Sequence, residues 1–445
     1  MSLPRYADYR DSGVASLGLV PSHWQIKRLR FVVELNPSKS EVASVDRQAD
    51  VSFLPMDAIG DDGTIRLDET RTLAQVESGY TYFRNGDVVI AKITPCFENG
   101  KGAVVRGLLD GVGFGTTELI VVRPKPQVTT SHYLGWLFAS PTFRKDAEGA
   151  MYGAGGQKRV PDSFVRDYLD AVPPIEEQSA IATFLDRETG KIDALIAEQE
   201  TLLTLLSEKR QATISHAVTR GLNPNAPMKD SGVPWLGEVP AHWEVRRLKT
   251  LSVFTTSGPR GWSERITEDG SLFIQSGDLG DNLEVDFLNA KRVSVDEDAE
   301  AARTRLADGD IVICITGAKT GNIALCGIIP EPAFVNQHLC LVRPNAEVHS
   351  RYLGLALKSR FGQVQLDLSQ YGLKQGLSLE NIRDLLIVLP PHDEQLAIAA
   401  HLDAEAAKFD RLTDDAKHAI ALLKERRSAL IAATVTGKID VRDIA

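Results

Sequence analysis

The chain has 445 residues, with 50 basic and 60 acidic side chains and a formal net charge of −10. At roughly 150 residues per domain, this length predicts about three folding units, and an apolar content of 43% is enough for real cores. The charge excludes a polybasic protein that coats nucleic acid, but a sum over the whole chain leaves local basic patches open.

Residues 1–10 carry charged residues and proline instead of the apolar stretch of a signal peptide. No uncharged apolar run approaches the roughly 18 residues that a membrane span requires. The sequence therefore predicts a cytoplasmic protein with no membrane partner. The four cysteines form no Cys-x-x-Cys pair, so we expect reduced thiols in the core.

An internal repeat is the main feature of the sequence. Asp-Ser-Gly-Val at 11–14 recurs at 230–233, and the match continues to 12 identities in 19 positions at a constant offset of 219. Three later motifs recur in the same order: Gly-Asp at 86–87 and 309–310, Val-Arg-Pro at 122–124 and 342–344, and Pro-Pro-x-x-Glu-Gln at 173–178 and 390–395. The chain is a duplicated unit of about 220 residues, which is too long for a solenoid repeat.

Each repeat changes character at its Pro-Pro pair. Before it, short β-rich runs at 87–93, 119–122, 310–315 and 339–342 alternate with turns, which predicts a mixed α/β (α+β) globule. After it, residues 176–216 contain no proline and only one glycine, with Ile and Leu at three- and four-residue spacing. A helix of that length would span about 60 Å. The same pattern follows the second pair.

We expect these two long helices to pack antiparallel and to separate two similar globular parts in a pseudo-twofold arrangement, like a coiled coil used as a spacer. An ordinary terminal helix bundle is the alternative. The expected domains are a first globular domain at 1–174, a first spacer helix at 175–221, a second globular domain at 222–391 and a second spacer helix at 392–445.

Motifs for catalysis are missing. No Gly-Lys pair has the flanking residues of a P-loop, and there is no His-Glu-x-x-His or Gly-x-Ser-x-Gly motif. The Asn/Asp-Pro-Pro-aromatic signature of amino-methyltransferases is also absent. His23 and His242 are expected to cap a turn beside Trp24 and Trp243, which we expect in the module cores. The aspartates of the Gly-Asp motifs are expected in strand-entry turns, so the sequence predicts neither catalytic residues nor a metal site.

These motifs resemble those of the specificity subunit of Type I restriction-modification systems. The similarity rests on the duplicated Pro-Pro-x-x-Glu-Gln motif before a long helix, on the helix endings Ala-Val-Thr-Arg-Gly at 217–221 and Ala-Thr-Val-Thr-Gly at 433–437, and on the Gly-x-Val-Pro-x-His-Trp entry motif. It extends over essentially the whole chain. In that family each globular half is a target recognition domain that reads one half of a split DNA site.

The resemblance implies double-stranded DNA as a partner, with two copies of a modification methyltransferase docked on the helices. Those subunits would transfer a methyl group from S-adenosylmethionine to adenine, and restriction subunits would use ATP and Mg for translocation and cleavage. This chain would bind no cofactor itself. Because the two halves differ outside the framework motifs, the target would be asymmetric, with half-sites about a helical turn apart, ~34–36 Å.

Candidate DNA contacts are donor-bearing side chains on equivalent loops of the two halves. They lie on a glycine-containing loop after residue 151 and its counterpart after residue 370, on the turn after each Gly-Asp strand, and on the loop at 257–260. A purely structural turn is the alternative for the first pair. The candidates are Lys92, Thr94, Asn99, Lys101, Tyr152, Gln157, Lys158, Arg159, Arg260, Thr316, Lys319, Thr320, Asn322, Tyr371, Lys374 and Gln375.

Charged residues near the ends of the helices are candidates for partner docking: Glu208, Arg210, Glu425 and Arg427. Solvated faces are the alternative for these positions. The sequence thus favours a non-catalytic DNA-recognition subunit. Two other functions stay open at this point, an enzyme with an unrecognised active site and a scaffold that holds two protein partners without reading DNA.

Overall fold

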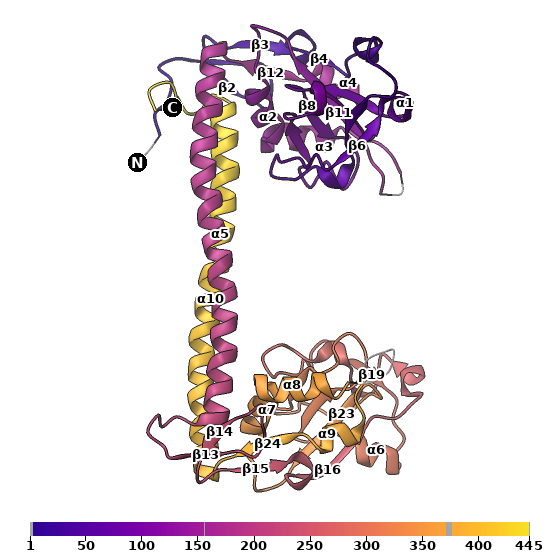
Figure 1. Cartoon of the computed structure of the whole chain (residues 1–445), viewed down its shortest axis with the longest axis vertical. Coiled ribbons are helices and arrows are strands. Elements are labelled where there is room, and N and C mark those ends of the chain that lie inside the picture. Colours follow the sequence, from indigo (N-terminus) through magenta and orange to yellow (C-terminus); the bar gives the residue numbers. More distant parts are fainter. Residues whose placement is uncertain (1–2, 155, 371–375, 445) are drawn as a thin grey trace. The chain divides into compact units, whose positions relative to one another are not determined.

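The computed structural model describes residues 3–154, 156–370 and 376–444. The chain divides into two compact units, each described here by itself. Unit 1 comprises Met1–Glu200 and His418–Ala445, and unit 2 comprises Thr201–Lys417. Each unit contains one globular module and part of both long helices, α5 (Ile175–Arg220) and α10 (His392–Val435), which are drawn in magenta and yellow in Figure 1.

Both long helices begin directly after a Pro-Pro pair and end before a glycine. Acidic residues occupy the first turn of each helix, where they complement the helix dipole. Gly221 and Gly437 have φ of 76° and 71°, the left-handed conformation that commonly ends a helix. The prediction of two long helices is confirmed, and Gly190 does not interrupt α5.

Within each unit the helices run antiparallel. In unit 1 the beginning of α5 packs on the end of α10, where Leu185 and Ile431 share one core. In unit 2 the end of α5 packs on the beginning of α10, where Val218 and Leu402 share another. The apolar stripes predicted from the sequence therefore pair with each other, as amphipathic helices require.

The first module is built on two four-stranded sheets. One has the order β4-β11-β8-β9 and is antiparallel, and the other has the order β6-β5-β10-β7 and includes a parallel pair of β5 and β10. Two short two-stranded ribbons, β1-β2 and β3-β12, complete it. The strands are β1 (Tyr9–Asp11), β2 (Leu19–Pro21), β3 (Gln25–Arg28), β4 (Val33–Leu35), β5 (Asp50–Leu54), β6 (Glu69–Thr72), β7 (Thr81–Arg84), β8 (Val88–Ala91), β9 (Gly102–Val104), β10 (Val112–Gly115), β11 (Leu119–Pro124) and β12 (Leu169–Val172).

The second module repeats the antiparallel sheet and the ribbons, and its mixed sheet keeps a parallel pair but differs from that of the first module at both edges. Its sheets have the orders β16-β23-β20-β21 and β17-β19-β18-β22, and its ribbons are β13-β14 and β15-β24. The strands are β13 (Met228–Asp230), β14 (Glu238–Pro240), β15 (Glu244–Arg247), β16 (Ser252–Ser257), β17 (Ile266–Thr267), β18 (Ser271–Ile274), β19 (Lys291–Val293), β20 (Ile311–Cys314), β21 (Ile323–Leu325), β22 (Ala333–Val335), β23 (Leu339–Pro344) and β24 (Leu386–Leu389). Duplication and a mixed α/β (α+β) fold, both predicted from the sequence, are confirmed.

Short helices accompany the sheets of both modules. In the first module α2 packs on β8, β9 and β11, and in the second α7 packs on β21 and β24. The short helices are α1 (Leu73–Val76), α2 (Ser131–Ala139), α3 (Pro141–Gly149), α4 (Asp162–Asp167), α6 (Ala299–Thr304), α7 (Ser350–Lys358), α8 (Arg360–Leu368) and α9 (Leu379–Arg383).

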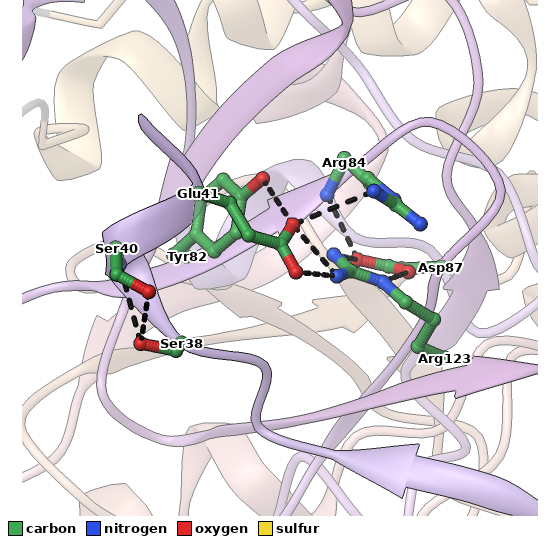
Figure 2. Close-up of polar contacts among 7 residues, drawn as sticks. All are labelled: Ser38, Ser40, Glu41, Tyr82, Arg84, Asp87 and Arg123. Atoms are coloured by element: carbon green, nitrogen blue, oxygen red, sulfur yellow. Dashed lines mark hydrogen bonds and ion pairs between the residues drawn. The ribbon is translucent and has the colours of Figure 1, made fainter. Parts of the chain in front are cut away.

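The Gly-Asp and Val-Arg-Pro motifs pair with each other across the central strands. Arg123 on β11 makes a bidentate contact with the Asp87 carboxylate before β8, at 2.7 and 2.8 Å, and Arg343 and Asp310 repeat it at 2.8 and 2.7 Å. Asp87 also accepts a backbone hydrogen bond from Arg84, so the predicted strand-entry turn is present. Figure 2 shows how Glu41 extends the network in the first module.

The entry, Pro-Pro and helix-end motifs meet at one joint in each unit. In unit 1 the Glu177 carboxylate accepts hydrogen bonds from the Trp24 indole at 3.0 Å and contacts the His23 ring at 2.8 Å. A Cβ on Gly437 would lie 2.4 Å from Pro21, so only glycine fits there. Trp24 is fully buried, as expected, and the core that contains it is shared by module residues such as Tyr133 and by both long helices.

The same joint in unit 2 unites Trp243, His242 and Glu394, with Gly221 packed on the Trp243 ring. His242 contacts the Glu394 carboxylate at 2.6 Å. The repeated motifs that carry the family resemblance therefore attach each module to its helices, and they leave the rest of each module free to differ.

Three of the four cysteines are buried free thiols, as predicted, while Cys96 is partly buried. None of the helices in the described ranges combines the length and the apolar character of a membrane span.

Candidate functional site

Loops far apart in the sequence converge at one end of the central sheet of the first module. The turn after β8 receives residues 158–160, because the Thr94 amide donates to the Lys158 carbonyl and the Val160 amide donates to the Lys92 carbonyl. The segment before β11 joins them, since the Lys92 amide donates to the Glu118 carbonyl at 2.9 Å. We call residues 92–94, 116–118, 152–154 and 156–159 the first loop cluster.

The second module builds the same backbone frame. The Leu377 amide donates to the Ile315 carbonyl, and the Ile315 amide donates to the His338 carbonyl, each at 2.9 Å. These two bonds correspond to those of Val160 and Lys92 in the first module. The loop at 257–260 also joins, because the Gly258 amide donates to the Asn336 carbonyl at 3.2 Å. Residues 257–260, 315–317, 336–338 and 376–377 form the second loop cluster.

The backbone positions correspond, but the side chains on them differ. Arg159 in the first cluster is held by the Glu118 carboxylate at 2.8 and 2.9 Å, and these hydrogen bonds lower the pKa of Glu118. Gly376 and His338 occupy the two corresponding positions in the second cluster. The first cluster therefore has an Arg–Glu ion pair where the second has an imidazole and a glycine, which carries no side chain.

Several of the predicted residues lie on these clusters. In the first, Lys92, Thr94 and Tyr152 come together with Gln157, Lys158 and Arg159, and the Tyr152 side chain is 65% exposed. In the second, Thr316 and the exposed Arg260 lie on loops of the cluster. Tyr371, Lys374 and Gln375 lie outside the described residues.

Other predicted residues of the same loops face away from the clusters. Lys101 donates to the Met56 carbonyl at 2.8 Å, and its counterpart Asn322 donates to the Leu279 carbonyl at 3.1 Å. Both side chains hold a neighbouring turn. Lys319 points at that turn as well, with its ammonium 3.3 Å from the Gly277 carbonyl.

The last two candidates, Thr320 and Asn99, lie on the turns that follow β20 and β8. Thr320 donates to the Gly317 carbonyl within its own turn. Asn99 lines a cavity of about 510 Å³ in unit 1, beside Trp136 and Arg427.

Sequence reasoning missed two segments of the clusters, Glu118 with its neighbours and residues 336–338. Both precede the Val-Arg-Pro strand of their repeat and contain polar side chains. Their position directly before a buried strand was the available signal. Only the pairing of that strand with β8 or β20 places them beside the other loops.

The docking candidates divide into two kinds. Arg427 pairs with Asp193 at 2.8 Å in unit 1, and Arg210 pairs with Asp410 in unit 2, so both arginines join α5 to α10. Glu208 and Glu425 are exposed. The helices also expose large apolar side chains: Leu195 and Leu422 in unit 1, and Leu202, Leu205 and Leu412 in unit 2.

Within the described residues, no three His, Cys, Asp or Glu side chains come together in a way that could hold a metal ion.

Comparisons with known proteins agree with this organisation. Residues 240–421 match the family model described as "Type I restriction modification DNA specificity domain". The chain is 37% identical over 480 aligned positions to the EcoEI specificity subunit of Escherichia coli, covering 86% of this chain and 78% of that protein. It is 41% identical over 188 residues to the EcoAI specificity subunit of the same organism, covering 42% of this chain and 31% of that protein.

Solved structures share the fold. A chain from a structure concerning assembly and conformational transition of the type I R-M system matches with a TM-score of 0.76 at 19% identity, covering 94% of this chain and 98% of that one. The HsdS subunit from Thermoanaerobacter tengcongensis matches with a TM-score of 0.57 at 19% identity and the same coverage. The identity and coverage of the EcoEI relative decide the family: this chain belongs to the specificity subunits of Type I restriction enzymes, the non-catalytic subunits that recognise the DNA target.

Proposed function

We propose that each loop cluster reads one half of a bipartite, asymmetric DNA target. The observation that carries this proposal is the shared backbone frame of the two clusters, on which corresponding positions hold different side chains. A constant frame with variable donors and acceptors suits two readers of different sequences, because base identity is read by side-chain chemistry at the groove edges.

The donors of the first cluster suit both kinds of DNA contact. Lys92 and Lys158 provide cations for phosphates, and Gln157 and Tyr152 provide polar groups for base edges or backbone. In the second cluster Thr316 and Arg260 have these roles, with Lys374 and Gln375 as further candidates. The chain is acidic overall, so we expect much of the phosphate affinity to come from its partners in the complex.

Two methyltransferase subunits would dock on the paired helices, and restriction subunits would join that core. The exposed leucines of α5 and α10 are apolar side chains that a docked protein could cover. Glu208 and Glu425 are candidates for the polar rim of that contact. S-adenosylmethionine, ATP and Mg would be bound by the partners, and the length of the helices would set the unread gap.

The test is single-molecule sequencing of adenine methylation in the host genome, with the gene intact and deleted. The proposal expects methylation at one split, asymmetric motif to disappear on deletion. The competing function is a scaffold that does not read DNA. It predicts an unchanged methylome and equal binding of the complex to duplexes of any sequence.

A further inference from the structure

The segment 336–338 of the second loop cluster carries side chains that differ from those at the corresponding positions of the first module. It is pinned on both sides: the Asn336 amide donates to the Ile274 carbonyl at 3.0 Å, and the Asn336 carbonyl accepts from Gly258. The Asn336 side chain is buried and accepts the His338 amide at 3.0 Å. Gln337 and His338 therefore follow a residue whose backbone is held by hydrogen bonds to two other segments.

The Gln337 side chain is incompletely paired. Its amide nitrogen lies 3.2 Å from His338 Nε2, and the Thr316 hydroxyl lies 2.5 Å from His338 Nδ1. Its Oε1 atom is buried with no hydrogen-bond partner. Turning the amide by 180° would pair Oε1 with the imidazole but would leave the nitrogen in the same unpaired position. One amide atom is therefore unpaired in either orientation.

An unpaired buried amide atom costs about 1–3 kcal/mol. The Gln337 residue as a whole is only partly buried, and His338 beside it is exposed, so the amide lies near the surface of the module, and contact with a ligand requires a change of rotamer. A ligand that satisfies both amide groups removes this cost. Binding is then favoured by the new hydrogen bonds and by removal of the free-energy cost that the unpaired amide atom imposes on the free protein.

The corresponding positions of the first module cannot make the same contact. Thr117 replaces Gln337, and Glu118 replaces His338 and is already bound to Arg159. The amide is thus a property of the second module alone, which is where a determinant of the second half-site should lie.

We infer that Gln337 reads an adenine in the half-site of the second module, and that His338 and Thr316 hold its side chain in the absence of DNA. An amide presents one donor and one acceptor in a plane, and this pair matches N7 and the N6 amino group of adenine in the major groove. The inference rests on the proposed function, because it assumes that the second loop cluster faces DNA.

The test compares the methylome of cells that carry the wild-type chain, Gln337→Met or Gln337→Glu, each with its partner subunits. Methionine keeps the size and removes both hydrogen bonds. We expect Gln337→Met to lower discrimination at one adenine position of the second half-site by about 5- to 150-fold, with the first half-site unchanged. Glutamate only accepts hydrogen bonds, so Gln337→Glu should move the preference at that position toward cytosine.

The matched control is Asn289→Ala, which removes an amide from an exposed turn of the same module and should leave both half-sites unchanged. Unaltered discrimination at every position in both Gln337 variants would overturn the inference. If Gln337→Met abolishes all methylation, the Gln337→Glu complex and competitor duplexes differing at each position of the half-site decide the question by the same criterion. Failure of the proposed function gives a different result, because the wild-type chain would then direct methylation to no split motif.

Discussion

Arg123 and Asp87 form a buried bidentate ion pair that joins the two central strands of the first module, with the Asp87 side chain only 1% exposed. Neither residue lies on the loop cluster. The pair links the start of β8 to the end of β11, whose opposite ends carry the turn at 92–94 and the segment 116–118. The ion pair therefore adds to the strand pairing that keeps those two segments in register.

Replacing Arg123 with methionine should destabilise unit 1 by about 3–5 kcal/mol, because a buried carboxylate loses its partner. Hydrogen–deuterium exchange of β8 and β11 in the full chain measures this change. Arg84→Met is the control: the Arg84 side chain is half-exposed and lies 3.5 Å from Glu41, so its loss should cost less than about 1 kcal/mol. Equal exchange rates in the two variants would contradict this account of the network.

Asp170 should make the stability of unit 1 depend on pH. Burial raises the pKa of Asp170 to about 7, and its Oδ2 atom has no hydrogen-bond partner. Because the folded state holds the proton more tightly than the unfolded chain, stability should fall as the pH rises from about 4 to about 7 and then level off. The total is about 4 kcal/mol.

The second module carries Ile387 where the first carries Asp170, one residue after the first position of β24 and β12 respectively. Asp170→Ile should therefore remove this pH dependence, and the reciprocal Ile387→Asp should create it in unit 2. Urea unfolding at pH 5 and pH 8 measures how the free energy of unfolding of the wild-type chain and of each variant depends on pH. A wild-type and an Asp170→Ile chain that differ by the same amount at both pH values would show that Asp170 does not titrate in this range.

Glu177 should contribute more to stability than Glu394, its counterpart at the joint of unit 2. Its carboxylate is 5% exposed and contacts Tyr6, His23 and Trp24, whereas the Glu394 side chain is 44% exposed. Glu177→Ala leaves buried donors unpaired and should cost at least about 2 kcal/mol, and Glu394→Ala should cost less. Exchange protection of the backbone amides in the second turns of α5 and α10 measures both. A larger loss at α10 would refute the ranking.

Lys158 and Lys101 should differ in their contribution to DNA binding. Lys158 is exposed on the first loop cluster, whereas the Lys101 ammonium is bonded to the Met56 carbonyl. In the assembled complex, Lys158→Ala should weaken binding to all duplexes alike and reduce the slope of log K against log salt by about 0.9. Lys101→Ala should leave that slope unchanged. Fluorescence anisotropy across a salt series separates them, and an equal change of slope would place Lys101 at the DNA.

Much of this organisation could be predicted because its signals are local. The apolar periodicity of residues 176–216 predicted α5, and the Gly-Asp turn predicted the entry to β8 and β20, since both depend on neighbours in the chain. The partners of those residues could not be predicted. Asp87 finds Arg123 only through the pairing of β8 with β11.

The sequence by itself determined the duplication, the two long helices, the absence of catalytic motifs and the family, because each of these features follows from the identity and the spacing of residues along the chain. The tertiary structure alone decided which side chains share a surface. It brought Glu118 to Arg159 and His338 to Thr316, and it turned Lys101 and Asn322 toward backbone carbonyls. The physical reason is that β-sheet pairing joins residues across long separations, and a side chain's role is set by the groups that this pairing puts beside it.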